Sequence, residues 1–209
     1  MDPQDAAPSD LFLARLTDAM LELAVESGWT HATLDRAAEK AGLTQGQALL
    51  AAPNGVADVL EAFGKRAATA AGAAVRAADN LKVREKVRAG VKGWLAALGG
   101  HKAAVKRAAA TPANLLTGPK GVWAAADAIW AALGDKSTDY NWYTKRMTLS
   151  AVLASMLAAW MGTDDEAQVD AFLDRRIENV MQFEKFKAQA RDAFAKMPDP
   201  MDLFGQRKA

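Results

Sequence analysis

Apolar residues recur every three or four positions along most of the chain, a spacing that places them on one face of an α-helix. The first 60 residues predict three helices, over 10–27, about 33–41 and about 45–50. Gly28 and Gly42 are expected to end the first two, because glycine readily adopts the left-handed conformation that follows a helix. Thr44 is placed to cap the third helix. Two short helices joined by a tight turn have the order of a helix-turn-helix.

The rest of the chain continues the same periodicity and predicts longer helices, at 56–78, 81–98, 101–110, 120–133, 139–161, 165–181 and 183–197. Residues 112–121 are expected to form a loop, because Pro and Gly are frequent there. Alanine, the strongest helix former, accounts for 48 of the 209 residues. The pattern therefore predicts an all-α protein, with a helix-turn-helix module over 1–55 and a larger helical domain over 56–209.

Charge is distributed unevenly along the chain, although the whole has a net charge of only +1. Residues 1–64 carry three basic and ten acidic side chains, a net −7, and residues 65–107 carry eleven basic and two acidic, a net +9. Between Ala41 and Gly64 there is no Lys or Arg. Because helix-turn-helix proteins bind DNA largely through cationic contacts to phosphates, we expect this module to be a scaffold without specific DNA binding.

Residues for catalysis or metal binding are scarce. The chain has no Cys, which excludes disulfides, thiolate metal sites and Cys nucleophiles. Neither His31 nor His101 follows a Glu at the spacing that di-iron sites in helical bundles use, and no nucleophile elbow or phosphate-binding loop is present. The acidic run 164–166 is expected to stabilise a helix start. We therefore predict neither enzymatic activity nor a metal or cofactor.

Large apolar residues separated by alanines are concentrated between 94 and 160. Alanine beside Trp or Met either lets helices approach closely or leaves space between them, and Met adapts its shape to variable ligands. Periodicity alone favours an ordinary core, and a lipid-binding tunnel is the alternative. The candidate tunnel residues are Trp94, Leu98, Leu116, Val122, Ile129, Leu149, Leu153, Met156, Leu157 and Trp160.

An aromatic pair lies among charged residues in the first turn of the helix predicted over 139–161. Trp, Tyr and Arg are the residues that most often dominate the energy of protein interfaces. A docking surface for a protein partner is one interpretation, and packing of Trp142 on the preceding loop is the other. The candidate docking residues are Asp139, Asn141, Trp142, Tyr143, Lys145 and Arg146.

The last predicted helix combines an aromatic stripe with a basic face, the composition of a helix that lies at a membrane surface. Phe183, Phe186 and Phe194 form the stripe, and Leu203 and Phe204 extend its apolar side past the prolines that follow. These five residues are the candidate membrane contacts. A helix docked on its own protein fits the same pattern.

Two segments resemble known families. Gly28-Trp29, Thr33-Leu34 and the run 37–44 (AAEKAGLT) resemble the DNA-binding domain of TetR-type regulators. The run 134–146 (GDKSTDYNWYTKR), followed by 172–177 (FLDRRI), resembles an accessory family of ubiquinone (coenzyme Q) biosynthesis: the ninth Coq protein and its bacterial relatives, found beside a ribosomal small-subunit gene.

The second resemblance implies a TetR-like fold that has lost DNA binding, a homodimer, binding of lipids that include ubiquinone precursors, and assistance to the pathway's hydroxylase. For this chain it implies a non-enzymatic protein that presents an isoprenoid quinone precursor to that hydroxylase. Its only ligand would be the lipid, and it would lie in the bacterial cytoplasm, peripheral to the inner membrane. The C-terminal helix is expected to be shortened or fused to the preceding one, and dimerisation is expected through 139–161 and 165–181. A ligand-responsive TetR-type transcriptional regulator is the alternative function.

Overall fold

The structure is a computed structural model that describes residues 7–114, 118–138 and 140–195, and the side chains within them except those of 113 and 183–195. Every regular element in these ranges is helical. The helices are α1 (Pro8–Ser27), α2 (His31–Lys40), α3 (Gln45–Ala51), α4 (Val56–Ala77), α5 (Val83–Gly99), α6 (Lys102–Ala109), the short 3-10 helix η2 (Pro112–Asn114), α7 (Gly118–Ala132), α8 (Tyr140–Gly162) and α9 (Glu166–Ala195). The prediction of an all-α protein is confirmed for these residues.

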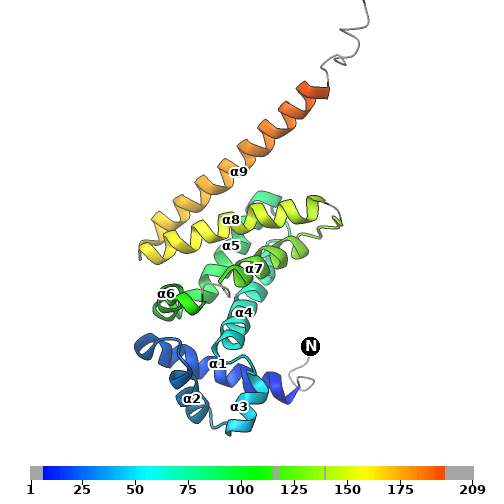
Figure 1. Ribbon diagram of the computed structural model, residues 1–209. Helices are drawn as coiled ribbons and strands as arrows, with labels where there is room; N and C mark the ends of the chain where they lie inside the picture. The colour runs from blue at the N-terminus through cyan, green and yellow to red at the C-terminus, as the bar shows by residue number, and fades with distance from the viewer. Residues whose placement is uncertain (1–6, 115–117, 139, 196–209) are drawn as a thin grey trace, which may run out of the picture.

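The helices α1, α2 and α3 pack together at one end of the molecule (Figure 1). Their ends are fixed by the signals expected from the sequence. Gly42 adopts a positive φ of 65° in the turn between α2 and α3. The Thr44 side chain accepts a hydrogen bond from the backbone N–H of Gln47, and the Gln47 side chain accepts one from the backbone N–H of Thr44. The order of elements fits a TetR-like chain, whereas the helix-turn-helix arrangement and the domain boundary after residue 55 stay predictions.

The long helix α4 connects this end to the rest and packs against both α5 and α7 (Figure 1). Glycines permit the close approach of these helices. A Cβ added to Gly90 of α5 would lie 2.7 Å from Cγ2 of Val75, and one added to Gly93 would lie 2.5 Å from Cβ of Ala74. Any larger residue at these two positions would push α5 away from α4, so the core around α4 is tightly packed.

The helix α8 lies on α7, and α9 packs on α8 and α5. A ladder of exposed ion pairs joins α5 to α9: Arg84 to Glu178, Arg88 to Asp174 and Asp170, and Lys92 to Asp170. The basic stretch seen in the sequence is therefore partly neutralised by carboxylates of α9. The C-terminal half of α9 projects beyond the other helices (Figure 1).

Two predicted boundaries are wrong. The helices expected at 165–181 and 183–197 form a single helix, α9, which agrees with the fused alternative, because no Gly or Pro interrupts residues 166–195. The loop expected at 112–121 is shorter, because α7 already begins at Gly118. No helix within the described ranges has the length and apolarity needed to cross a membrane.

Candidate ligand cavity and docking surface

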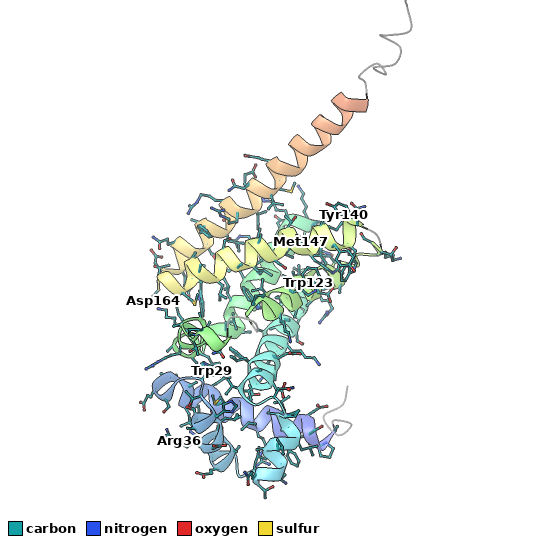
Figure 2. The ribbon with its side chains drawn as sticks, in the orientation of Figure 1. Trp29, Arg36, Trp123, Tyr140, Met147 and Asp164 are labelled. Carbon is teal, nitrogen blue, oxygen red and sulfur yellow. The ribbon has the colours of Figure 1, made fainter. Side chains whose placement is uncertain are left out.

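An apolar cavity of about 130 Å³ lies where α4, α5, α6 and α7 meet the end of the N-terminal helices. Trp29, labelled in Figure 2, belongs to its lining, and its indole Nε1 donates a hydrogen bond to the backbone oxygen of Ala104 in α6 at 2.9 Å. Among the described residues of the lining, Asn114 adds the one polar side chain besides the tryptophan indoles. The lining residues are Trp29, Leu60, Phe63, Gly64, Trp94, Leu98, Val105, Ala108, Ala109, Asn114, Gly118, Gly121, Val122 and Leu157.

The structure brings only some of the candidate tunnel residues together. Those that line the cavity are Trp94, Leu98, Val122 and Leu157. Four others fill the buried core without reaching the cavity, namely Ile129, Leu149, Leu153 and Met156. Trp160 lines a different groove, and Leu116 lies outside the described residues.

The N-terminal half of the chain also contributes to this cavity, which the helical periodicity did not predict. Trp29 comes from the turn after α1, and Leu60 and Phe63 come from α4. The one available signal was Trp29 itself, a large aromatic residue directly after the glycine that ends α1. Its hydrogen-bond partner, Ala104 of α6, lies 75 residues further along the chain. A contact between residues so far apart cannot be predicted from a local sequence pattern.

A second, wider hollow of about 500 Å³ lies between the end of α5 and the turn from α8 to α9. Two ion pairs border it: Lys92 Nζ lies 2.7 Å from Asp170 Oδ2, and Lys102 Nζ lies 2.6 Å from Asp164 Oδ1. These lysines hold the pKa of each carboxyl below its usual range by hydrogen bonding and charge. We call this hollow the α5–α9 groove. Its lining residues are Lys92, Leu95, Ala96, Gly99, Gly100, Lys102, Trp160, Thr163, Asp164, Glu166, Val169, Asp170 and Leu173.

The acidic run 164–166 has the structural role that was predicted. Asp165 Oδ1 accepts hydrogen bonds from the backbone N–H groups of Ala167 and Gln168, at 2.9 and 3.2 Å, and so caps α9. His101 likewise lies at the start of α6, where its ring meets that of Phe63 edge-on. Across the described part of the chain, no three His, Cys, Asp or Glu side chains gather as a potential metal site.

A network of charges with a buried centre holds the corner between α7 and α8: the side chains of Arg146 and Asp135 are buried, and those of Asp127 and Lys145 are partly exposed. The Arg146 side chain donates to Asp127 Oδ1 at 2.6 Å and to Asp135 Oδ2 at 3.1 Å, and Lys145 Nζ donates to Asp135 Oδ1 at 2.7 Å. Hydrogen bonds from Lys145, Ser137 and Arg146 hold the pKa of Asp135 well below its usual range. The charges are thus satisfied within the chain.

Trp142 lies against this network. The Arg146 guanidinium carbon is 4.0 Å from the centre of its ring, and the rings of Trp123 and Tyr143 are 5.9 and 4.8 Å away. The indole is half-buried and packs on Trp123 of α7 and on Arg146, whereas packing on the preceding loop and docking of a partner both stay predictions. Arg146, one of the candidate docking residues, is only 3% exposed and forms ion pairs with two carboxylates of its own chain.

The exposed part of this corner consists of other side chains. Tyr140, Tyr143 and Met147 are 78%, 58% and 62% exposed, and they follow one another at helical spacing along α8. Figure 2 labels Tyr140 and Met147 on this helix, above Trp123 of α7. Asn141 is also exposed and Lys145 is half-buried. Asp139 lies outside the described residues.

The candidate membrane contacts lie outside the described side chains. Phe183, Phe186 and Phe194 belong to α9, but their side chains are outside the described part. Leu203 and Phe204 lie beyond the described residues altogether. Their contact with a membrane stays a prediction.

Comparison with known proteins supports the resemblance drawn from the motif in 134–146. Residues 115–184 match the model of the COQ9 family. A probable ubiquinone biosynthesis protein coq9, mitochondrial, from Dictyostelium discoideum is 30% identical over 115 residues, which cover 52% of this chain and 37% of that protein. The match therefore spans little more than a third of this relative.

Proposed function

We propose, from the COQ9 family domain that residues 115–184 carry, that this chain is a non-enzymatic accessory protein of ubiquinone biosynthesis. It binds an isoprenoid quinone precursor and presents it to the pathway's hydroxylase. The observation that carries the proposal is the family match, because it contains the α7–α8 corner and both motif runs, 134–146 and 172–177. The name of the Dictyostelium relative gives the same pathway.

The apolar cavity supports a role in lipid binding. Its walls include the aromatic rings of Trp29, Phe63 and Trp94, and burying an isoprenoid tail contributes about 25 cal/mol per Å² of apolar surface. Pockets that enclose a whole ligand usually have about 300–1,000 Å³, so a volume of about 130 Å³ accommodates only part of a long tail. The ligand must therefore widen the cavity or extend beyond it.

The corner between α7 and α8 supports a role in docking. Its exposed face presents Tyr140, Tyr143 and Met147, and the Arg146 network below holds Trp142 in one position. A rigid surface loses little conformational entropy on binding. We propose that the hydroxylase contacts this face, with Tyr143 as an exposed anchor and Asn141 and Lys145 on the same turns of α8.

We also propose that the protein is a homodimer that does not bind DNA specifically, and that it lies at the cytoplasmic face of the inner bacterial membrane. The rival function of a TetR-type regulator is disfavoured because the three basic side chains of residues 1–64 are already bound within the chain, so they are not free to contact DNA phosphates. Arg15 donates to the Ala41 carbonyl, Arg36 to Ser27 Oγ, and Lys40 to Glu22. Meanwhile α3, the helix that would face DNA, exposes Leu49 and Leu50.

Deletion of the gene in its own host tests this function. The deleted strain should lose ubiquinone and accumulate the hydroxylase's substrate, and the wild-type chain should restore both. The Ala108→Phe variant fills the cavity from α6 and should restore neither, whereas Ala103→Phe, at an exposed position of the same helix, should behave as wild type. Normal ubiquinone in the deleted strain would contradict the proposal.

A further inference from the structure

The larger hollow of the molecule is separate from the cavity proposed for the isoprenoid tail. The α5–α9 groove has about 500 Å³, against about 130 Å³ for the apolar cavity, and only the groove falls in the usual size range of ligand sites. The two share no lining residue, although both use α5. The groove could therefore bind a ligand independently of the apolar cavity.

The floor of the groove is apolar. Leu95 and Leu173 are buried, and Trp160 contributes an indole that is 9% exposed. Val169 adds a further buried aliphatic side chain. An occupant must present an apolar surface to this floor, because a strongly hydrated group would lose its water without gaining hydrogen bonds there.

The rim of the groove is charged but internally balanced. Lys92 is paired with Asp170 and Lys102 with Asp164, while Lys102 also donates to the Thr163 carbonyl at 2.5 Å. With Glu166, the lining carries two lysines and three carboxylates, a net −1. An anionic ligand would meet this excess and compete with both carboxylates for their lysines, so the rim disfavours fatty acids and phosphates.

A neutral ligand with acceptor oxygens avoids that cost. An ammonium group has three N–H donors, and the side chain of Lys92 is 47% exposed beside Asp170, its one ion-pair partner among the described residues. It can therefore donate to a carbonyl, methoxy or hydroxyl oxygen without leaving its ion pair. A flat ring that bears such oxygens can pack on the apolar floor and accept a hydrogen bond from Lys92 at the rim.

We infer that the α5–α9 groove is a second ligand site, which binds the neutral, oxygen-bearing ring of a quinone or phenol. The choice of ring rests on the proposed function, whereas its neutrality follows from the paired rim. The apolar cavity and the groove then take chemically different ligand parts, a hydrocarbon tail and an oxygenated ring.

Glycines at the edge of the groove provide a clean way to fill it. A Cβ added to Gly99 or Gly100 would meet no heavy atom within 4 Å, and Gly100 has an ordinary helical φ of −61°. Gly99→Leu and Gly100→Leu therefore place a side chain at the groove without displacing the core. Gly46→Leu on α3, equally free of neighbours and remote from the groove, is the matched control.

The test is isothermal titration calorimetry of the full chain with a tail-less probe, 2,3-dimethoxy-5-methyl-1,4-benzoquinone. Wild type and Gly46→Leu should bind it alike, and each groove variant should bind at least about tenfold more weakly. Laurate, an anion with an apolar chain, should bind all four proteins equally. The site would be overturned if wild type failed to bind the probe, or if the groove variants bound it as tightly as wild type. Its preference for neutral ligands would be overturned if Gly99→Leu lowered the affinity for laurate.

The gene-deletion phenotype does not depend on any of these results, so the proposed function and this site can fail separately.

Discussion

The N-terminal helices and the α7–α8 corner both depend on polar side chains, but they use them differently. Apart from the buried hydrogen bond between Trp29 and Ala104, the polar contacts of α1–α3 that stabilise these helices are local or exposed. Thr44 caps α3, and Lys40 pairs with Glu22 at the surface. At the corner, Lys145 and Arg146 converge on Asp135, whose side chain is only 5% exposed. The first region could lose any one contact and keep the others, whereas the second is a single coupled unit.

This difference indicates where the chain is specific. Local caps stabilise helices in almost any fold, so they carry little information about function. A buried network requires several residues at once and fixes one geometry. The COQ9 match covers residues 115–184, so it includes this corner and lies outside α1–α3.

The largest expected effect is that of Arg146→Met. Removal of one partner leaves Asp135 buried without half of its counter-charge, and breaking a buried pair in this way typically costs about 3–5 kcal/mol. Urea denaturation followed by circular dichroism measures the free energy of unfolding. Arg146→Lys keeps a positive charge but cannot contact Asp127 and Asp135 at once. Its free energy of unfolding should lie between those of wild type and Arg146→Met. A loss below about 1 kcal/mol in Arg146→Met would show that the network is not coupled.

The next effect concerns pH. The pKa of Asp135 is lowered in the folded state, so its contribution is complete above the ordinary carboxyl pKa of about 4 and is lost as the pH falls below that value towards the lowered one. Asp135→Asn should remove about 2 kcal/mol at pH 7 and less at pH 3. Unfolding free energies at both pH values check this. An identical loss at pH 7 and pH 3 would mean that the charge of Asp135 contributes nothing.

A smaller effect is expected for the cap of α3. Thr44→Ala removes the oxygen that accepts from the N–H of Gln47 and should cost about 1 kcal/mol. Because the cap and the corner share no partner, the double variant with Arg146→Met should show the sum of the two losses within about 0.5 kcal/mol. A larger departure from additivity in urea denaturation would connect the two regions and break the distinction between them.

The smallest effect belongs to the surface pair of Lys40 and Glu22. Their side chains are 47% and 61% exposed, and exposed pairs contribute about 0.2–1 kcal/mol that salt screens. Lys40→Ala should therefore lose less than about 1 kcal/mol at low salt and close to nothing at 1 M NaCl. Loss that persists at 1 M NaCl would show packing by the lysine stem instead of charge.

The same contrast explains what the sequence could predict. The caps and helix limits of α1–α3 come from signals within a few residues, such as Thr44 three positions before Gln47. The continuity of α9 could also be predicted from the sequence. The composition changes near residue 182, but no Gly or Pro lies there to end a helix. The burial of Arg146 was not readable, because its partners Asp127 and Asp135 become neighbours only when α7 and α8 pack.

The candidate site was predictable to a similar degree. Apolar residues of α5, α7 and α8 were recognised as a group, but their division between core and cavity depends on how the helices cross. Leu153 and Leu157 are one turn apart on α8, yet only Leu157 reaches the cavity. The charged rim of the groove joins α5, α6 and α9, so it has no counterpart in a single segment.

Mass spectrometry of organic extracts from gently purified protein tests lipid binding most directly. The wild-type chain and Ala103→Phe should release an isoprenoid lipid in near-stoichiometric amount, and Ala108→Phe, which fills the cavity between α4 and α6, should release at least about tenfold less. Extracts without lipid from a folded wild-type protein, or equal lipid from Ala108→Phe, would contradict the proposal that this cavity holds the tail.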